Sequence, residues 1–248
     1  MEALGPSQII FCAAVITAAF AVRSGAGFGG GAVAVPFLAL VLPLQIVVPV
    51  VVILNMLSSV GHGIRAWRNI EWAELLRLFP FTLAGIGIGI YLLAQLDPRP
   101  LRRALGVFVS VYAIYAIATA GHAWTIARRW LVPFGATMSF AAGFVGALFG
   151  GAAGPFYVMY LNALKLSRDS FRVTITTMML LQGLVRIGGY AGLGFYDVSS
   201  LALLVASLPP MLLGSYIGVR LVQRYDQTKF NRVVGGVVLI SGAALLFK

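Results

Sequence analysis

The chain has 248 residues, of which 60% are hydrophobic and only 10% are charged, and its mean hydropathy is +0.95. Because a soluble domain carries roughly 25% charged residues, this composition excludes a soluble protein and predicts one that lies in the lipid bilayer. The net charge of +11 does not indicate nucleic-acid binding, because the basic residues lie in short loops between apolar runs rather than in one stripe or tail.

Apolar runs of helical length follow one another along the chain. A run of about 20 apolar residues is long enough to cross a bilayer as a helix. Such runs lie at 8–27, 44–66, 73–94, 101–120, 131–149, 170–192, 199–222 and 230–247. Two shorter runs, 32–43 and 153–164, follow glycine clusters, and at 1.5 Å per residue they reach only about 16–18 Å. We therefore predict an all-α membrane protein in which these two runs form half-helices or re-entrant segments.

The first apolar run ends in a glycine-rich segment, RSGAGFGGGAVAVP, at 23–36. Its Gly25, Gly27 and Gly30 match the G-x-G-x-x-G spacing of dinucleotide sites, which also need a preceding strand and an acidic residue about 20 positions later. Here an apolar run precedes the glycines, and the next carboxylate is Glu71. We interpret the segment as a helix break whose half-helix offers free backbone N–H groups to an anion. Close helix packing is the alternative role for the glycines.

The second half of the sequence repeats the first. FGGGAVAVPF at 28–37 is matched by FGGAAGPF at 149–156, which has two residues fewer. Further matches at a fixed offset of 129 residues pair Pro80 with Pro209, Gly85 with Gly214, Gly89 with Gly218, Asp97 with Asp226, Arg103 with Arg232 and Gly106 with Gly235. We expect two repeats, 1–125 and 126–248, each of four transmembrane helices plus one half-helix. The matched G-x-x-x-G pairs are predicted to serve helix packing.

The basic residues of equivalent loops indicate that the two repeats are inverted. Arg65 and Arg68 flank the loop after Trp67, whereas its counterpart, GLGFYDVSS, has no basic residue. Applied to all loops, the positive-inside rule places equivalent loops on opposite sides and both termini outside the cytoplasm. Inverted repeats with interrupted helices are typical of secondary transporters, which bind their substrates near the midplane.

The ionisable residues inside the spans are basic. The carboxylates sit at span ends or in loops, whereas Arg23, His62, Arg65 and Arg186 lie within apolar sequence. Arginine and backbone N–H groups without an acid select anions, and the planar guanidinium suits oxyanions. Arg65 and Arg186 also match at an offset of 121 residues. The alternatives are that the arginines snorkel to the interface and that His62 packs rather than carrying a proton.

Polar side chains follow the same helices. Asn55, Ser58 and Ser59 fall on one helical stripe with His62 and Arg65, and Thr174, Thr177 and Gln182 precede Arg186 in the second half. We expect these residues to face a cavity, with interhelical hydrogen bonding as the alternative. The predicted substrate-binding residues are Arg23, Ser24, Gly29, Gly30, Gly31, Asn55, Ser58, Ser59, His62, Arg65, Gly150, Gly151, Gly154, Thr177, Gln182 and Arg186. We predict no catalytic residue, metal or cofactor.

These features resemble the TauE/SafE sulfite exporter family over essentially the whole chain. The resemblance rests on the helix that ends in GAGFGGGAVAVPFL, the following polar helix with Arg65 and Arg68 near its end, and the copy that begins GFVGALFGGAAGPF. It extends to the linkers LDPRPLRRALG and RYDQTKFNRVVG. The resemblance implies an inner-membrane transporter of sulfur-containing anions such as sulfite, sulfonates or sulfoacetate.

Together these observations predict a secondary transporter of a small anion that works by alternating access, with His62 as a candidate for proton coupling. A homodimer is left open. An anion channel that uses the same arginines and N–H groups is the first alternative. An intramembrane enzyme is a more distant one, because no carboxylate pair, histidine cluster or Ser–His–Asp set lies at membrane depth in the sequence.

Overall fold

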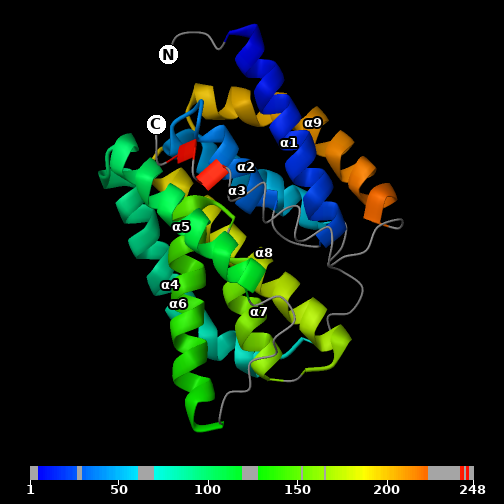
Figure 1. Ribbon diagram of the computed structural model, residues 1–248. Helices are drawn as coiled ribbons and strands as arrows, with labels where there is room; N and C mark the ends of the chain where they lie inside the picture. The colour runs from blue at the N-terminus through cyan, green and yellow to red at the C-terminus, as the bar shows by residue number, and fades with distance from the viewer. Residues whose placement is uncertain are drawn as a thin grey trace.

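The computed structural model describes residues 5–26, 30–60, 70–118, 128–151, 153–164, 166–222, 241–242 and 244–245. These residues form helices and connecting turns, and none of them forms a strand. The helices in chain order are α1 (Pro6–Ala26), α2 (Gly30–Leu38), α3 (Leu44–Val60), α4 (Trp72–Gln95), α5 (Pro98–Ala118), α6 (Leu131–Phe149), α7 (Gly154–Ala163), α8 (Arg168–Gly192) and α9 (Val198–Val222), with a 3-10 turn, η2 (Arg128–Trp130), before α6 (Figure 1). The predicted all-α fold is confirmed. The expected helix over 230–247 lies outside the described residues except at 241–242 and 244–245.

Four of the helices, α1, α4, α6 and α9, are long and apolar enough to cross a membrane. Helix α3 is equally apolar but has only 17 residues. Helices α5 and α8 are long enough to span and are less apolar, since α5 has three arginines among its first six residues and α8 carries Arg186 in its interior. The chain is therefore a helical protein of the membrane with several spans.

The two short apolar runs form short helices. Helix α2 has 9 residues and α7 has 10, so at 1.5 Å per residue each is about 13–15 Å long and cannot span a bilayer alone. Most of α2 is buried, as expected because irregular backbone at membrane depth must be satisfied within the protein. Gly150 ends α6 in the left-handed region, at φ 73°, and Pro155 then occupies the first turn of α7, where its missing N–H leaves no helical bond unmade.

Tyrosine hydroxyls tie α7 to α4. Tyr157 and Thr82 share a hydrogen bond of 3.0 Å between their hydroxyl oxygens. One turn further along α7, the Tyr160 hydroxyl donates to Glu74 Oε2 at 2.5 Å, and Glu74 also accepts from the exposed Arg77 at 2.9 Å. These bonds hold the second half-helix against a full-length span.

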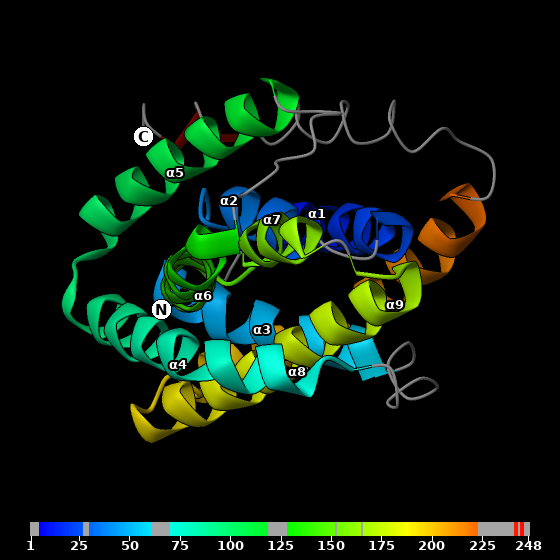
Figure 2. The ribbon, with the colours of Figure 1, turned by 90° about the horizontal axis from the view of Figure 1, so that it is seen from below.

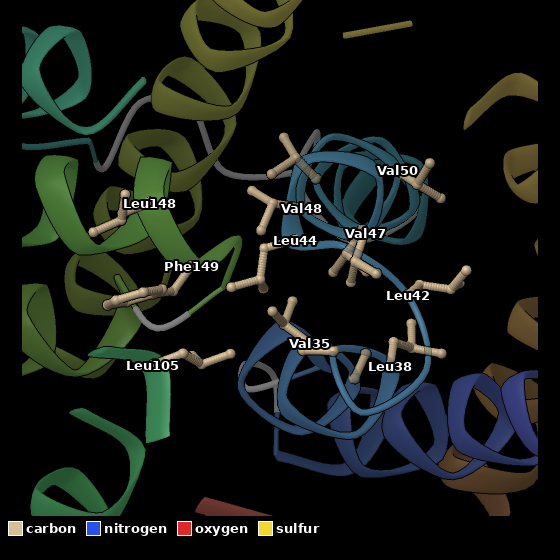
Figure 3. Close-up of a cluster of buried hydrophobic side chains, with 14 of the residues drawn as sticks. Val35, Leu38, Leu42, Leu44, Val47, Val48, Val50, Leu105, Leu148 and Phe149 are labelled. Carbon is tan, nitrogen blue, oxygen red and sulfur yellow. The ribbon is translucent and has the colours of Figure 1, made fainter. Parts of the chain in front are cut away.

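The main hydrophobic core surrounds α2. Figure 3 shows Val35 and Leu38 of α2 pointing toward Leu44 and Val48 of α3, while side chains of α5 and α6 approach from the other side. The core residues that Figure 3 labels are Val35, Leu38, Leu42, Leu44, Val47, Val48, Val50, Leu105, Leu148 and Phe149. Because each of these side chains is at most 5% exposed, the half-helix after the first glycine cluster is enclosed by protein.

The long helices pack in two close pairs, α4 with α6 and α1 with α9, and α5 lies at the edge of the molecule (Figure 2). The matched glycines lie at these two contacts. A Cβ atom would lie within 2.6 Å of a facing carbonyl oxygen at each of them, namely Phe140 O for Gly85, Phe144 O for Gly89, Thr17 O for Gly214 and Ala21 O for Gly218. The prediction that both G-x-x-x-G pairs serve helix packing is confirmed.

Candidate functional site

A small pocket lies where the end of α1, the faces of α3 and α8 and the start of α7 meet. Its volume of about 40 Å³ exceeds the roughly 10–15 Å³ that one water molecule needs, so it has room for a small ligand. The residues that line it are Arg23, Val52, Asn55, Met56, Ser59, Gly150, Gly151, Ala153, Gly154, Met179, Leu180, Gln182, Gly183 and Arg186.

Arg23 reaches the pocket from the last turn of α1 and is held by α3. Its Nη2 donates to Asn55 O at 3.0 Å and to the Ser59 hydroxyl, and that hydroxyl donates to the same carbonyl at 2.8 Å. Gly30 makes room for the arginine, because a Cβ there would lie 3.0 Å from Arg23 Cδ. The first glycine cluster thus allows α2 to begin directly against this side chain.

Arg186 enters the pocket from α8 and is only 6% exposed. Its Nε donates to Gln182 O at 3.3 Å, and its Nη1 donates to Gly146 O in the last turn of α6. The next carbonyl, of Ala147, accepts from the Tyr190 hydroxyl at 2.5 Å. A cation is favourable at this position, because the carbonyls at the C-terminal end of a helix carry partial negative charge.

The two arginines give the pocket an uncompensated positive charge within the described part of the chain. Neither of them forms an ion pair with a described carboxylate, and the ion pair found there, Arg77 with Glu74, lies outside the pocket lining. A buried charge is costly unless it is paired or hydrogen-bonded. The bonds to backbone carbonyls offset only part of this cost, so the pocket favours an anion.

The two glycine clusters meet beside the pocket. A Cβ on Gly31 would lie 2.5 Å from Gly151 Cα, and a Cβ on Gly151 would lie 2.3 Å from Gly31 Cα. Asn55 joins the two clusters from α3, since its Nδ2 donates to Gly150 O at 3.5 Å and its Oδ1 would lie 3.2 Å from a Cβ on Gly30. The second cluster lines the pocket, whereas the first lies behind Arg23 and Asn55.

The structure brings together half of the predicted substrate-binding residues. Those that line the pocket are Arg23, Asn55, Ser59, Gly150, Gly151, Gly154, Gln182 and Arg186, and Gly30 and Gly31 pack directly behind them. Gly29, His62 and Arg65 lie outside the described residues.

Ser24, Ser58 and Thr177 do not line the pocket. At 100° per residue, Ser58 is rotated from the pocket-facing Ser59 by about one quarter of a turn, and Thr177 lies about 140° from Gln182. The Thr177 hydroxyl instead donates to Val173 O at 2.9 Å within its own helix. Polarity alone therefore did not identify which face of α3 and α8 is turned to the pocket.

Several pocket residues are apolar and were not predicted from the sequence. A signal for them exists, because the lining residues of α3 and α8 match at an offset of 127 residues: Val52 with Met179, Asn55 with Gln182, Met56 with Gly183 and Ser59 with Arg186. Each set follows the spacing i, i+3, i+4, i+7 of one helical face. On this register Arg186 is the counterpart of Ser59 and not of Arg65.

Comparisons with known proteins identify a family and a relative for this chain. The family described as "Sulfite exporter TauE/SafE" matches residues 11–245. A curated relative, "Probable inner membrane transporter protein TsaS" from Comamonas testosteroni, is 25% identical over 198 residues, which cover 79% of this chain and 80% of the relative. No solved structure matches the chain. The family match includes both glycine clusters and both pocket arginines.

Proposed function

Because the match extends over residues 11–245, this chain belongs to the sulfite exporter TauE/SafE family. We propose that it is a secondary transporter that moves a small sulfur-containing anion by alternating access. The family and the relative are those of membrane transporters rather than enzymes. The chain is accordingly a transporter of the inner membrane. What we propose beyond this is the coupling of transport to an ion gradient, the alternating-access mechanism and the identity of the bound anion.

The observation that carries the proposal is the pocket between Arg23 and Arg186. Two guanidinium groups reach it from different helices, and neither has a carboxylate partner in the described chain. Guanidinium groups bind oxyanions through paired hydrogen bonds. Gly154, at the start of α7, adds the partial positive charge of a helix N-terminus to the same pocket. An oxyanion would therefore be held by charges and dipoles of one sign.

Alternating access rests on the two repeats, 1–125 and 126–248, which we propose are inverted. The helix packing supports this, since α1 contacts α9 and α6 contacts α4. In each contact the first transmembrane helix of one repeat meets the third transmembrane helix of the other, through glycines that match at an offset of 129 residues. Transporters with such repeats rock one unit against the other around a central site. From the distribution of basic residues among the loops, we further propose that both termini lie outside the cytoplasm.

Transport into liposomes tests the proposal. Purified protein should move sulfite or a small sulfonate under a pH gradient or a membrane potential, and a dependence on the pH gradient would support proton coupling, for which His62 is the candidate carrier. The variants Arg23→Gln and Arg186→Gln should abolish transport, because each removes a charge from the pocket. Arg77→Gln is the matched control, since Arg77 lies on the exposed side of α4. Absence of movement under both gradients would reject the proposal.

An anion channel would use the same arginines, so electrical recordings are needed to separate the two. The burial of the site favours a transporter, because Gln182 is 1% exposed and Arg186 is 6% exposed, whereas a channel needs a continuous open path. Conductance far above a transporter turnover, without coupling to a gradient, would instead establish the channel.

A further inference from the structure

Helix α3 presents two adjacent rows of side chains to the pocket. Asn55 and Ser59, four residues apart, form a polar row, and Val52 and Met56, also four residues apart, form an apolar row. At 100° per residue, the two rows lie side by side along one face of the helix. The wall that α3 gives the pocket is therefore polar along one side and apolar along the other.

Helix α8 presents the same two rows. Gln182 and Arg186 form the polar row, and Met179 and Gly183 form the apolar row, with Leu180 beyond it. Because the spacing is identical to that of α3, the apolar row again follows the polar row in the same rotational order. Two helices that contact each other thus both offer the ligand a polar edge and an apolar edge.

The two apolar rows differ at one position, where Met56 of α3 is matched by Gly183 of α8. Gly183 is buried, and a Cβ built there would have no other described atom within 4 Å. A buried position with open space in front of it faces an internal cavity rather than lipid. Methionine side chains, such as Met56 and Met179 in this lining, adapt to the shape of an apolar ligand.

We infer that Gly183, together with Met56 and Met179, forms an apolar wall that determines which substituent a bound anion can carry beside its oxyanion head, and that this wall selects short apolar substituents such as those of the short alkanesulfonates. This inference rests on the proposed transport of a sulfur-containing anion. The head binds at Arg23 and Arg186, and the substituent lies against Met56 and Met179 in the space in front of Gly183. A bare inorganic oxyanion satisfies the polar rows and leaves the apolar rows without a partner.

The inference predicts how affinity depends on chain length. Each methylene moved from water to an apolar surface raises affinity about fourfold, from about 0.8 kcal/mol per group. Affinity should therefore rise from methanesulfonate through ethanesulfonate to propanesulfonate and exceed that for sulfate and sulfite. The rise ends where the substituent fills the space in front of Gly183.

Binding of these five anions to the purified full-length protein, measured by calorimetry, tests the inference. The variants are Gly183→Ala and Gly183→Val, which fill the space, and the matched controls are Gly188→Ala and Gly188→Val. Gly188 lies on the same helix, is exposed, does not line the pocket and has no other described atom within 4 Å of its Cβ position. Both controls therefore reproduce the change in helix propensity without changing the pocket.

We expect Gly183→Val to weaken propanesulfonate binding about tenfold or more through overpacking, with Gly183→Ala intermediate and a smaller loss for sulfite, which has no substituent to displace. The Gly188 variants should keep the rise of affinity with chain length. Equal binding of sulfite, sulfate and propanesulfonate, or an equal effect of Gly183→Val and Gly188→Val, would overturn the inference and leave the anion site intact. If none of the five anions binds, the proposed function fails as well.

Discussion

The matched glycines allow a quantitative test of the packing between the long helices. Helix α4 has a glycine at every second position from 85 to 89, namely Gly85, Gly87 and Gly89. A Cβ on Gly85 would lie 2.2 Å from Phe140 O of α6, whereas a Cβ on Gly87 would have no other described atom within 4 Å. Replacing each with alanine therefore adds the same methyl group to the same helix, once inside the contact and once outside it.

We expect the free energy of unfolding of Gly85→Ala to be about 1–3 kcal/mol lower than that of Gly87→Ala. Both variants gain the roughly 0.8–1 kcal/mol by which alanine exceeds glycine in a helix, so this term cancels between them. At Gly85 the added atom is more than 1 Å closer than the 3.4 Å of ordinary contact, and overpacking of this kind costs about 1–3 kcal/mol. Gly214→Ala should show a similar loss, because its Cβ would lie 2.2 Å from Thr17 O.

Reversible unfolding in detergent, followed by denaturant titration, measures these differences. Gly87→Ala should be at least as stable as the parent protein, and Gly85→Ala and Gly214→Ala should both be less stable than Gly87→Ala. The reasoning would be refuted if Gly85→Ala and Gly87→Ala had equal free energies of unfolding. A loss at Gly85 without one at Gly214 would mean that the two contacts are not equivalent.

Two further predictions concern contacts that position Arg186 and α7. Gly146→Ala should weaken anion binding about fivefold or more by displacing Arg186, whose Nη1 would lie 3.0 Å from the new Cβ; calorimetry should show no such loss for Gly188→Ala. Tyr160→Phe removes the hydrogen bond to Glu74 and should lower the free energy of unfolding by about 1.5–3 kcal/mol. The exposed ion pair between Arg77 and Glu74 should contribute less than about 1 kcal/mol to the free energy of unfolding. An equal loss of stability in Arg77→Ala and Tyr160→Phe would therefore contradict the stabilising role given to the Tyr160–Glu74 hydrogen bond.

Much of the helical framework could be predicted from the sequence. Helix α4 was expected over 73–94 and spans Trp72–Gln95, and α9 was expected over 199–222 and spans Val198–Val222. Apolar runs of this length are bounded by turn and charged residues, which define their ends closely. The run expected over 32–43 instead forms α2 from Gly30 to Leu38, because Gly30 and Gly31 belong to its first turn and residues 39–41 form a turn.

The candidate site was predictable in its polar side chains and in the second glycine cluster, but not in its other apolar residues. Charged and polar residues within apolar sequence are visible without a structure, which is how Arg23, Asn55 and Arg186 were identified. Met56 and Gly183 are of the same types as residues that face lipid, so composition could not distinguish them. The approach of Gly31 to Gly151 joins segments 120 residues apart and depends on how the two repeats pack, which no local pattern determines.

The lack of a described carboxylate beside Arg23 and Arg186 has an electrical consequence under the proposed mechanism. An empty pocket carries two positive charges, and a pocket that holds a monoanion carries one. Moving one elementary charge across the full membrane potential changes the electrical free energy by about 2.3 kcal/mol per 100 mV. The return of the empty site therefore responds to voltage more strongly than the passage of the loaded site. A transport rate limited by that return step would change with membrane potential even at saturating anion.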